Sequence, residues 1–326
     1  MARDLESMTR GLRSYLSDGA RITRIVALST GHSNETYLIE GIDRILRMPP
    51  SEEGLLPPYD MARQHAIFDA VGKAAGGPPV PRMYELCTDA SVIGDPFFLM
   101  QRFDGEAFDH VAPDWMKRAD ADTVASMCSQ WVGAVTALHR QPASLMPTGA
   151  RSVAQEIAHW LNVAVQAEAE GGLIDLLEAL RADPPAASGP MTPVHGDPKQ
   201  GNCLWQGPRL QALLDWEMAA IGEPLTDLGY MLQFYDQGEV SFANAGFEID
   251  GWWSREQVID EWQRAAQRSA RDLRRYEALA LCKVTSIIAL GHHLSRTGRA
   301  TDPRFASWGA VVPLYLDLAQ RRVTMQ

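Results

Sequence analysis

The sequence lacks the excess of basic residues that a broad nucleic-acid-binding surface requires. Its 326 residues include 30 lysines and arginines against 41 aspartates and glutamates, which gives a formal net charge of −11. Proteins hold nucleic acids largely through phosphate contacts, so a surface with this balance repels the phosphate backbone over much of its area. We therefore expect no nucleic-acid partner.

Cysteine is also scarce, and its spacing excludes two common kinds of site. The four cysteines are scattered, with neither the C-x-x-C pairs of metal sites nor the density of a disulfide framework. The N-terminal segment carries charges throughout, unlike a secretory signal peptide. We expect no membrane span, because no run approaches roughly 18 apolar residues. These absences predict a reduced, cytoplasmic protein that does not associate with a membrane.

Short β segments dominate the first third of the chain, and helices dominate the rest. Apolar residues recur every three or four positions in 4–18, which predicts a helix. One further helix, 59–71, is expected among about five strands, at 21–29, 35–40, 44–48, 80–86 and 96–103. After Pro113 helical spacing prevails, notably in 124–138, 256–268, 271–294 and 305–319. The pattern predicts an α+β fold divided into a strand-rich part, 1–103, and a helical part, 104–326.

Polar residues suited to phosphoryl transfer are concentrated in one segment. Residues 194–205 read V-H-G-D-P-K-Q-G-N-C-L-W, and L-L-D-W-E follows at 213–217. Phosphoryl transfer needs an acceptor for the hydroxyl proton and a held metal ion that neutralises the triphosphate oxygens. Asp197 suits the first role, and Asn202 and Asp215 suit the second.

This segment resembles the catalytic loop of the aminoglycoside phosphotransferase-like kinases, a family with choline-kinase-like members that is related to the eukaryotic protein kinases. The similarity continues through G-E-P-L-T-D-L-G-Y at 222–230. The resemblance implies a bilobal protein-kinase-like fold, in which a small lobe with an antiparallel sheet precedes a mostly helical lobe. It also implies ATP or GTP and Mg²⁺ as cofactors.

The resemblance assigns roles to residues at the matching positions. It implies catalytic roles for Asp197, Lys199 and Asn202. Asn202 would also share the metal ion with Asp215. Structural support of the loop would come from His195 and from Asp227, which would hold the loop backbone.

The loop that covers the phosphates in such a kinase would lie at 29–37, between two strands. Backbone N–H groups there would meet the nucleotide, with Gly31, Ser33 and Asn34 as the candidate residues. Because Gly31 is the only glycine in this loop, an ordinary hairpin turn fits it too. Arg47 occupies the position of the strand lysine that contacts phosphates, although a solvated strand arginine has the same local pattern.

One position departs from the family pattern. The helical glutamate that pairs with the strand cation is replaced by Gln64. Its amide would still accept a hydrogen bond from Arg47, but the ion pair would be lost unless another carboxylate, such as Glu53, takes its place. This departure puts the nucleotide geometry in question.

Residues 96–105, P-F-F-L-M-Q-R-F-D-G, resemble the hinge whose backbone binds adenine in these kinases. Gln101, Arg102 and Phe103 would then lie beside the adenine, with Met100 in front of them. A buried strand that leaves one lobe would show the same pattern, so both interpretations fit the segment.

The sequence thus predicts an ATP-dependent phosphotransferase that acts on a hydroxyl group of a small molecule. Three segments are most similar to kinase-like proteins associated with acyl-CoA dehydrogenases: S-N-E-T-Y-L-I, I-L-R-M-P-P and 213–230. This similarity implies a hydroxyacyl-CoA acceptor. An aminoglycoside or related antibiotic is the alternative acceptor, and the negative net charge would attract it. An inactive nucleotide-binding module is the alternative of another class. Gly31-His32-Ser33 does not fit a hydrolase nucleophile elbow, because Glu35 stands where a second glycine is required.

Overall fold

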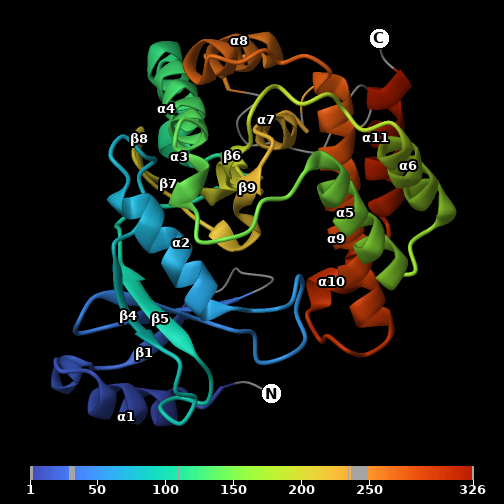
Figure 1. The fold of residues 1–326 in the computed structure, drawn as a ribbon. Helices are drawn as coiled ribbons and strands as arrows, with labels where there is room; N and C mark the ends of the chain where they lie inside the picture. Colours follow the sequence, from blue (N-terminus) through green and yellow to red (C-terminus); the bar gives the residue numbers. More distant parts are fainter. Residues whose placement is uncertain (1–2, 29–33, 109–110, 234, 236–248, 325–326) are drawn as a thin grey trace.

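The computed structural model describes residues 3–28, 34–108, 111–233, 235 and 249–324, which form a protein-kinase-like fold with two lobes (Figure 1). The N-terminal lobe is built on one antiparallel sheet with the strand order β1-β2-β3-β5-β4. Its strands are β1 (Ile25–Leu28), β2 (Glu35–Ile39), β3 (Arg44–Met48), β4 (Met83–Cys87) and β5 (Phe97–Gln101). The predicted α+β architecture is therefore confirmed.

The two faces of this sheet are covered by two helices. Phe97 of β5 belongs to the apolar cluster that buries one side of α1 (Leu5–Tyr15). Phe98, the next residue, points the other way and packs in the cluster that buries α2 (Met61–Lys73). The alternation follows from the two-residue period of a strand. The sheet thereby joins α1 on one face and the larger lobe, through α2, on the other.

The C-terminal lobe is mostly helical. Its helices are α3 (Asp114–Lys117), α4 (Ala121–His139), α5 (Val153–Gln166), α6 (Gly171–Ala182), α7 (Leu225–Met231), α8 (Arg255–Ala266), α9 (Leu273–Arg296), α10 (Pro303–Trp308) and α11 (Val312–Thr324). The lobe also has two short antiparallel sheets. The strand β6 (Thr192–Val194) pairs with β9 (Ala220–Gly222) between α4 and α9 (Figure 1), and β7 (Cys203–Gln206) pairs with β8 (Arg209–Leu213), which also packs on α4.

Polar side chains fix where several helices begin. The N-cap residues of α1, α2, α4, α5 and α8 each accept a hydrogen bond from the backbone N–H three residues later; they are Asp4, Asp60, Asp120, Ser152 and Ser254. Such caps satisfy backbone donors that have no partner inside the helix. The caps account for helix starts close to those expected from the apolar pattern.

Helix α9 has the length that the sequence analysis expected for 271–294, shifted by two residues, and it is apolar over much of that length. By length and composition it could cross a membrane, but 67% of its most apolar window is buried inside the protein. It packs against α5, α6, α7, α10 and α11. Within the described part of the chain, α9 is therefore the core helix of the larger lobe.

The predicted helix at 305–319 is wrong as a single element. The structure has α10 and α11 instead, separated at Gly309–Val311. Gly309 lies against the ring of His292, and a Cβ there would come within 2.7 Å of that ring. Glycine at 309 thus permits the close packing on α9, and apolar spacing alone did not reveal the break.

Candidate active site

The segment between β6 and β7 is held by one buried carboxylate. Asp227 on α7 accepts hydrogen bonds from the backbone N–H groups of His195 (2.7 Å) and Gly196 (2.8 Å). His139 Nε2 donates to the same carboxylate at 2.9 Å, and Trp262 Nε1 donates to His139 Nδ1 at 3.2 Å. Helices α4, α7 and α8 therefore converge on the backbone of this loop.

The hydrogen bonds around Asp227 also determine its charge. Burial by itself would raise the pKa of Asp227, but the hydrogen bonds from His139 and from the loop outweigh it and lower the pKa below the usual range. Asp227 thus stays ionised in the folded protein, and its interactions stabilise the fold above the unfolded pKa. That stability is lost as the pH falls through the native pKa.

We expect Asp227→Ala to lower the free energy of unfolding by about 3–5 kcal/mol at pH 7, because it leaves buried donors of the loop without an acceptor. Urea unfolding followed by circular dichroism measures the change. The gap between wild type and variant should begin to narrow below pH about 4, where the unfolded chain takes up the proton, and should close as the pH falls through the lower native pKa of Asp227. Asp175→Ala, at an exposed position on α6, should change stability by less than about 0.5 kcal/mol. An equal effect of both variants would contradict the role of Asp227.

His195 links the loop to the strand that ends at Asp215. Its Nδ1 accepts a hydrogen bond from the backbone N–H of Asp197 at 3.1 Å, so Nε2 must carry the proton that it donates to the carbonyl oxygen of Leu214 at 2.9 Å. Burial lowers the pKa of His195 despite three nearby aspartates. The imidazole is therefore a neutral spacer between the two loops.

Asp197 has one oxygen ready for a ligand. Its side chain is mostly buried, and Oδ1 has no hydrogen-bond partner among the described residues. Lys199 Nζ lies 3.9 Å from the other oxygen, Oδ2. Asn202 Nδ2 donates to the carbonyl oxygen of Asp197 at 2.8 Å, which fixes the amide beside the loop. A buried carboxylate oxygen without a partner is able to accept a hydrogen bond from a group outside the chain.

Asp215 follows β8 and lies close to the same loop. The backbone N–H of Leu214 donates to the carbonyl oxygen of Asn202 at 2.8 Å, so the two loops are paired directly before Asp215. Asp215 itself has a left-handed backbone (φ 65°, ψ 65°), which few residues other than glycine adopt. Burial would raise the pKa of Asp215, but Arg47 and Lys199 outweigh it and lower the pKa. The Asp215 carboxylate is therefore ionised.

The pairing of the two loops brings a set of hard oxygen ligands together. Because the Leu214 N–H bonds the Asn202 carbonyl oxygen, the side chains of Asn202 and Asp215 belong to adjoining backbone segments. Carboxylate and amide oxygens are the ligands that Mg²⁺ prefers, and substrate phosphates and water usually complete its shell. No cluster of three or more His, Cys, Asp or Glu side chains that could hold a metal occurs in the described ranges. The donor set therefore fits a Mg²⁺ ion shared with a nucleotide better than a metal held by protein alone.

Arg47 of β3 reaches across to this site from the other lobe. Its Nη2 donates to Asp215 Oδ1 at 2.5 Å. The hydrogen bond expected from Arg47 to Gln64 is not found among the described contacts, and Arg47 Nε is buried without a partner there. Glu53, the alternative carboxylate, pairs with Arg299 instead. The partner of Arg47 is thus the aspartate of the opposite lobe, which local sequence could not indicate.

Helix α2 contacts the Asp215 loop through a residue that the sequence analysis did not select. Arg63 donates to the backbone carbonyl oxygens of Glu217 (3.0 Å) and Ala219 (2.6 Å). Gln64, the next residue, is buried on the apolar side of α2. Burial, helped by nearby Arg151, lowers the pKa of Arg63. A lone arginine at a helix start carried no sequence signal for this contact.

The predicted phosphate loop supplies three further candidate residues for nucleotide binding. Gly31 and Ser33 lie outside the described residues. Asn34 is buried, and its Nδ2 donates to Glu217 Oε2 at 2.7 Å, which ties the end of the predicted phosphate loop to the Asp215 loop. This contact brings a residue of the predicted phosphate loop into the site.

The predicted adenine neighbours follow β5. Gln101 ends that strand, and its backbone N–H bonds the carbonyl oxygen of Arg82 at 2.8 Å. Arg102 is exposed and pairs with Asp43 at 2.5 Å, so its side chain is directed to the turn between β2 and β3. Phe103 is half-buried. Because the Arg102 side chain is paired with Asp43, the predicted binding of adenine at Arg102 would fall to its backbone.

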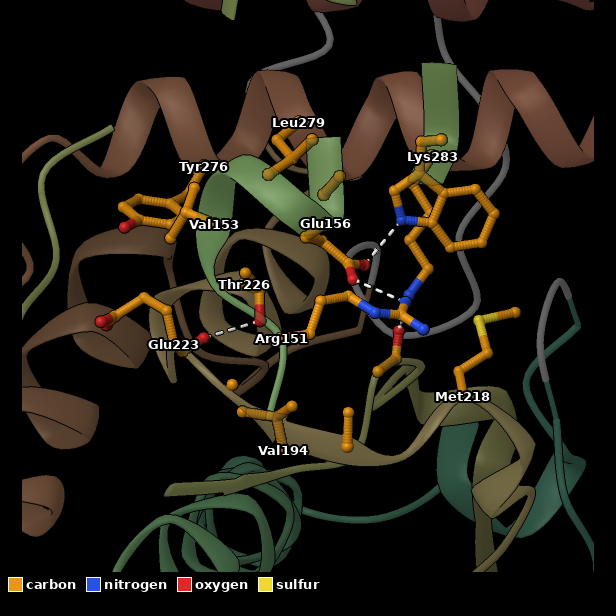
Figure 2. Close-up of a pocket in the computed structure, with 15 residues that line it drawn as sticks. Arg151, Val153, Glu156, Val194, Met218, Glu223, Thr226, Tyr276, Leu279 and Lys283 are labelled. Carbon is orange, nitrogen blue, oxygen red and sulfur yellow. Dashed lines mark hydrogen bonds and ion pairs between the residues drawn. The ribbon is translucent and has the colours of Figure 1, made fainter. Parts of the chain in front are cut away.

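A pocket opens beside the catalytic-loop backbone (Figure 2). It lies between α5, α9 and the β6–β9 pair, and Gly196 and Met218 form part of its wall. Arg151 donates to Glu156 Oε2 at 2.9 Å on one side. Lys283 of α9 enters from the other side (Figure 2). Sequence reasoning missed these charged residues, and the available signal was a single lysine inside the long apolar pattern of α9.

Comparisons with known proteins identify relatives of this chain. A model of the phosphotransferase enzyme family, APH, matches residues 24–279. Mouse acyl-CoA dehydrogenase family member 10 is 27% identical over 239 residues, which cover 71% of this chain and 22% of that protein. Probable acyl-CoA dehydrogenase IBR3 of Arabidopsis thaliana is 27% identical over 293 residues, with 79% of this chain and 34% of that protein covered. The chain thus spans less than two thirds of the length of these curated relatives.

Solved structures share the fold. A candidate aminoglycoside phosphotransferase from Ralstonia eutropha superposes with a TM-score of 0.74 at 19% identity, covering 96% of this chain and 98% of that one. The GDP and kanamycin complex of an aminoglycoside phosphotransferase superposes with a TM-score of 0.62 at 15% identity, with 98% of each chain covered. Together with the family match over most of the sequence, these findings confirm the resemblance inferred from the catalytic loop. The chain belongs to the phosphotransferase enzyme family.

Proposed function

We propose that this protein transfers the γ-phosphoryl group of ATP or GTP to a hydroxyl group of a small molecule. The observation that carries the proposal is the buried Asp197 oxygen without a partner, on a loop that Asp227 fixes. A substrate hydroxyl is the kind of donor that this oxygen lacks. Asp197 would accept the hydroxyl proton as the new oxygen–phosphorus bond forms and the bond from the γ-phosphorus to the bridging oxygen breaks, which releases the nucleoside diphosphate.

The residues around Asp197 would orient and neutralise the phosphates. Asn202 and Asp215 would hold Mg²⁺, which supplies positive charge to the phosphate oxygens when bound. Lys199, which lies beside Asp197, adds a further cation at the loop. Arg47 has a fork of donors, of which one bonds Asp215, and it would contact phosphates with the others. Gly31, Ser33 and Asn34 would cover the phosphates, and the backbone at Gln101, Arg102 and Phe103 would bind adenine.

The acceptor would enter the pocket beside Gly196. We favour a hydroxyacyl-CoA, because relatives named as acyl-CoA dehydrogenase family members match this chain across most of its length. The pocket itself offers two cations, Arg151 and Lys283, against two carboxylates, Glu156 and Glu223. A site for a polycationic aminoglycoside would be expected to carry more carboxylates than cations, and the lining of this pocket has equal numbers of the two. The kanamycin complex among the solved structures keeps an antibiotic as the competing acceptor.

The test offers purified protein Mg-ATP or Mg-GTP with a series of hydroxyacyl-CoAs and, in parallel, with kanamycin-type amines. We expect nucleoside diphosphate release at least about tenfold above the acceptor-free rate with one or more hydroxyacyl-CoAs, because an aligned hydroxyl competes well with water. Mass spectrometry of the acceptor should show one added phosphate. The unhydroxylated acyl-CoA of the same chain length is the matched control.

Nucleoside diphosphate release with the kanamycin-type amines, but with none of the hydroxyacyl-CoAs, would contradict the hydroxyacyl-CoA acceptor. It would still support phosphotransferase activity. Binding of Mg-nucleotide without turnover on any acceptor would count against the proposed activity and favour a nucleotide-binding module.

A further inference from the structure

A lysine is buried in the middle of the apolar core helix α9, beside the catalytic loop. Lys283 is 6% exposed, and its ammonium donates a hydrogen bond to the carbonyl oxygen of Gly196. The ammonium also lies over two aromatic rings, 5.0 Å from the centroid of Trp160 and 5.1 Å from that of Tyr230. One cation from α9 thus joins α5, α7 and the catalytic loop.

This arrangement is costly for a purely structural residue. Removing an ammonium from water costs several kcal/mol unless a charged partner compensates, and an apolar side chain of similar size often stabilises a fold more. Lys283 makes no salt bridge to a carboxylate within the described residues. Glu156, the nearest candidate in the pocket, is bonded to Arg151 and Trp160. Burial accordingly lowers the pKa of Lys283, against the fields of Glu156, Asp197 and Asp227.

The contact of Lys283 falls on the peptide that precedes Asp197. Gly196 has a positive φ of 86°, and a Cβ there would lie 2.6 Å from the carbonyl oxygen of Met218, so the loop can turn here only with glycine. Glycine allows the turn but does not by itself restrict the backbone. Asp227 binds the N–H of Gly196, and Lys283 binds its carbonyl oxygen. The residue is therefore held on both of its polar groups.

We propose that Lys283 is a positioning residue of this site, which holds the Gly196 carbonyl and so fixes the backbone from which Asp197 projects. Its ammonium also places positive charge near the Asp197 carboxylate. The contribution of Lys283 to turnover rests on the proposed function. Its restraint on the loop backbone is independent of that function and can be measured separately.

The test compares wild type with Lys283→Met, which keeps the length of the side chain and removes the donor and the charge. In hydrogen exchange followed by mass spectrometry, we expect amides in 195–199 to exchange at least about tenfold faster in the variant, with β1–β5 unchanged. With the acceptor from the screen above, kcat should fall by about 10- to 100-fold, because small displacements of a reacting group are costly. KM for Mg-ATP should stay within about twofold.

Lys283→Arg keeps a donor and a charge at this position and should restore part of both the loop protection and kcat. It also carries the test if the methionine variant does not fold. Lys73→Met, at an exposed lysine of α2, is the matched control and should behave as wild type.

Unchanged exchange at 195–199 in Lys283→Met would overturn the proposal, and so would faster exchange spread evenly over both lobes. Failure of the arginine variant to recover any loop protection would also contradict it. If wild type shows no turnover on any acceptor, the proposed function fails, and the exchange measurement alone decides the role of Lys283.

Discussion

Asp197→Asn should reduce turnover by about 10²- to 10⁴-fold while Mg-ATP affinity stays within about threefold. A positioned base contributes a factor of this size, and an amide cannot accept the hydroxyl proton. The substitution keeps the shape of a side chain that is mostly buried on a loop held by Asp227. Diphosphate release with the acceptor measures turnover, and isothermal titration calorimetry measures nucleotide affinity.

The matched control is Asp175→Asn on the exposed side of α6, which should leave both quantities unchanged. Turnover of Asp197→Asn within tenfold of wild type would remove Asp197 from the proposed role. A parallel loss of nucleotide affinity would instead indicate that Asp197 holds the metal or the phosphates, which also contradicts the assignment.

Asp215→Ala should weaken magnesium-dependent ATP binding by more than about 100-fold. Replacing even a group that only supports a metal ligand costs about 10- to 100-fold, and here a ligand itself is removed. The substitution also takes the partner from Arg47, whose side chain is mostly buried. Titration of ATP with and without Mg²⁺ separates metal-dependent binding from the rest.

Asp215→Asn is the second variant, because it keeps an oxygen for Arg47 and for the metal but removes the charge. It should bind Mg-ATP with an affinity between wild type and Asp215→Ala. Thermal unfolding of each variant controls for loss of structure. If Asp215→Ala is folded and binds Mg-ATP like wild type, the metal site lies elsewhere.

The nucleotide side of the site shows how a residue pattern can identify a position without identifying its partner. The sequence correctly placed Arg47 on the third strand and Gln64 on the following helix. It could not show that Arg47 bonds Asp215, which is far away in sequence, or that Arg63 rather than Gln64 contacts the Asp215 loop. Residues that are adjacent on a helix point in different directions, so one position decides which lobe a side chain meets.

The sequence by itself determined the family, the α+β order of elements and the catalytic loop, because these depend on local spacing and on a short run of specific residue types. It also predicted the five strands of the N-terminal sheet and the helices α1, α2, α4, α8 and α9, whose apolar periods survive packing. It failed at 305–319, where one apolar pattern spans two helices that are separated at 309–311.

Only the tertiary structure decided which polar and charged groups from distant segments pair with one another. The bonds of Asp227 to His139, of Arg47 to Asp215 and of Lys283 to Gly196 each join segments far apart in the chain. Such contacts depend on how whole helices and sheets pack, and a lysine inside an apolar helix looks the same in sequence wherever its ammonium ends. Burial then gives these pairs their importance, because a buried charge or donor must find its partner within the fold.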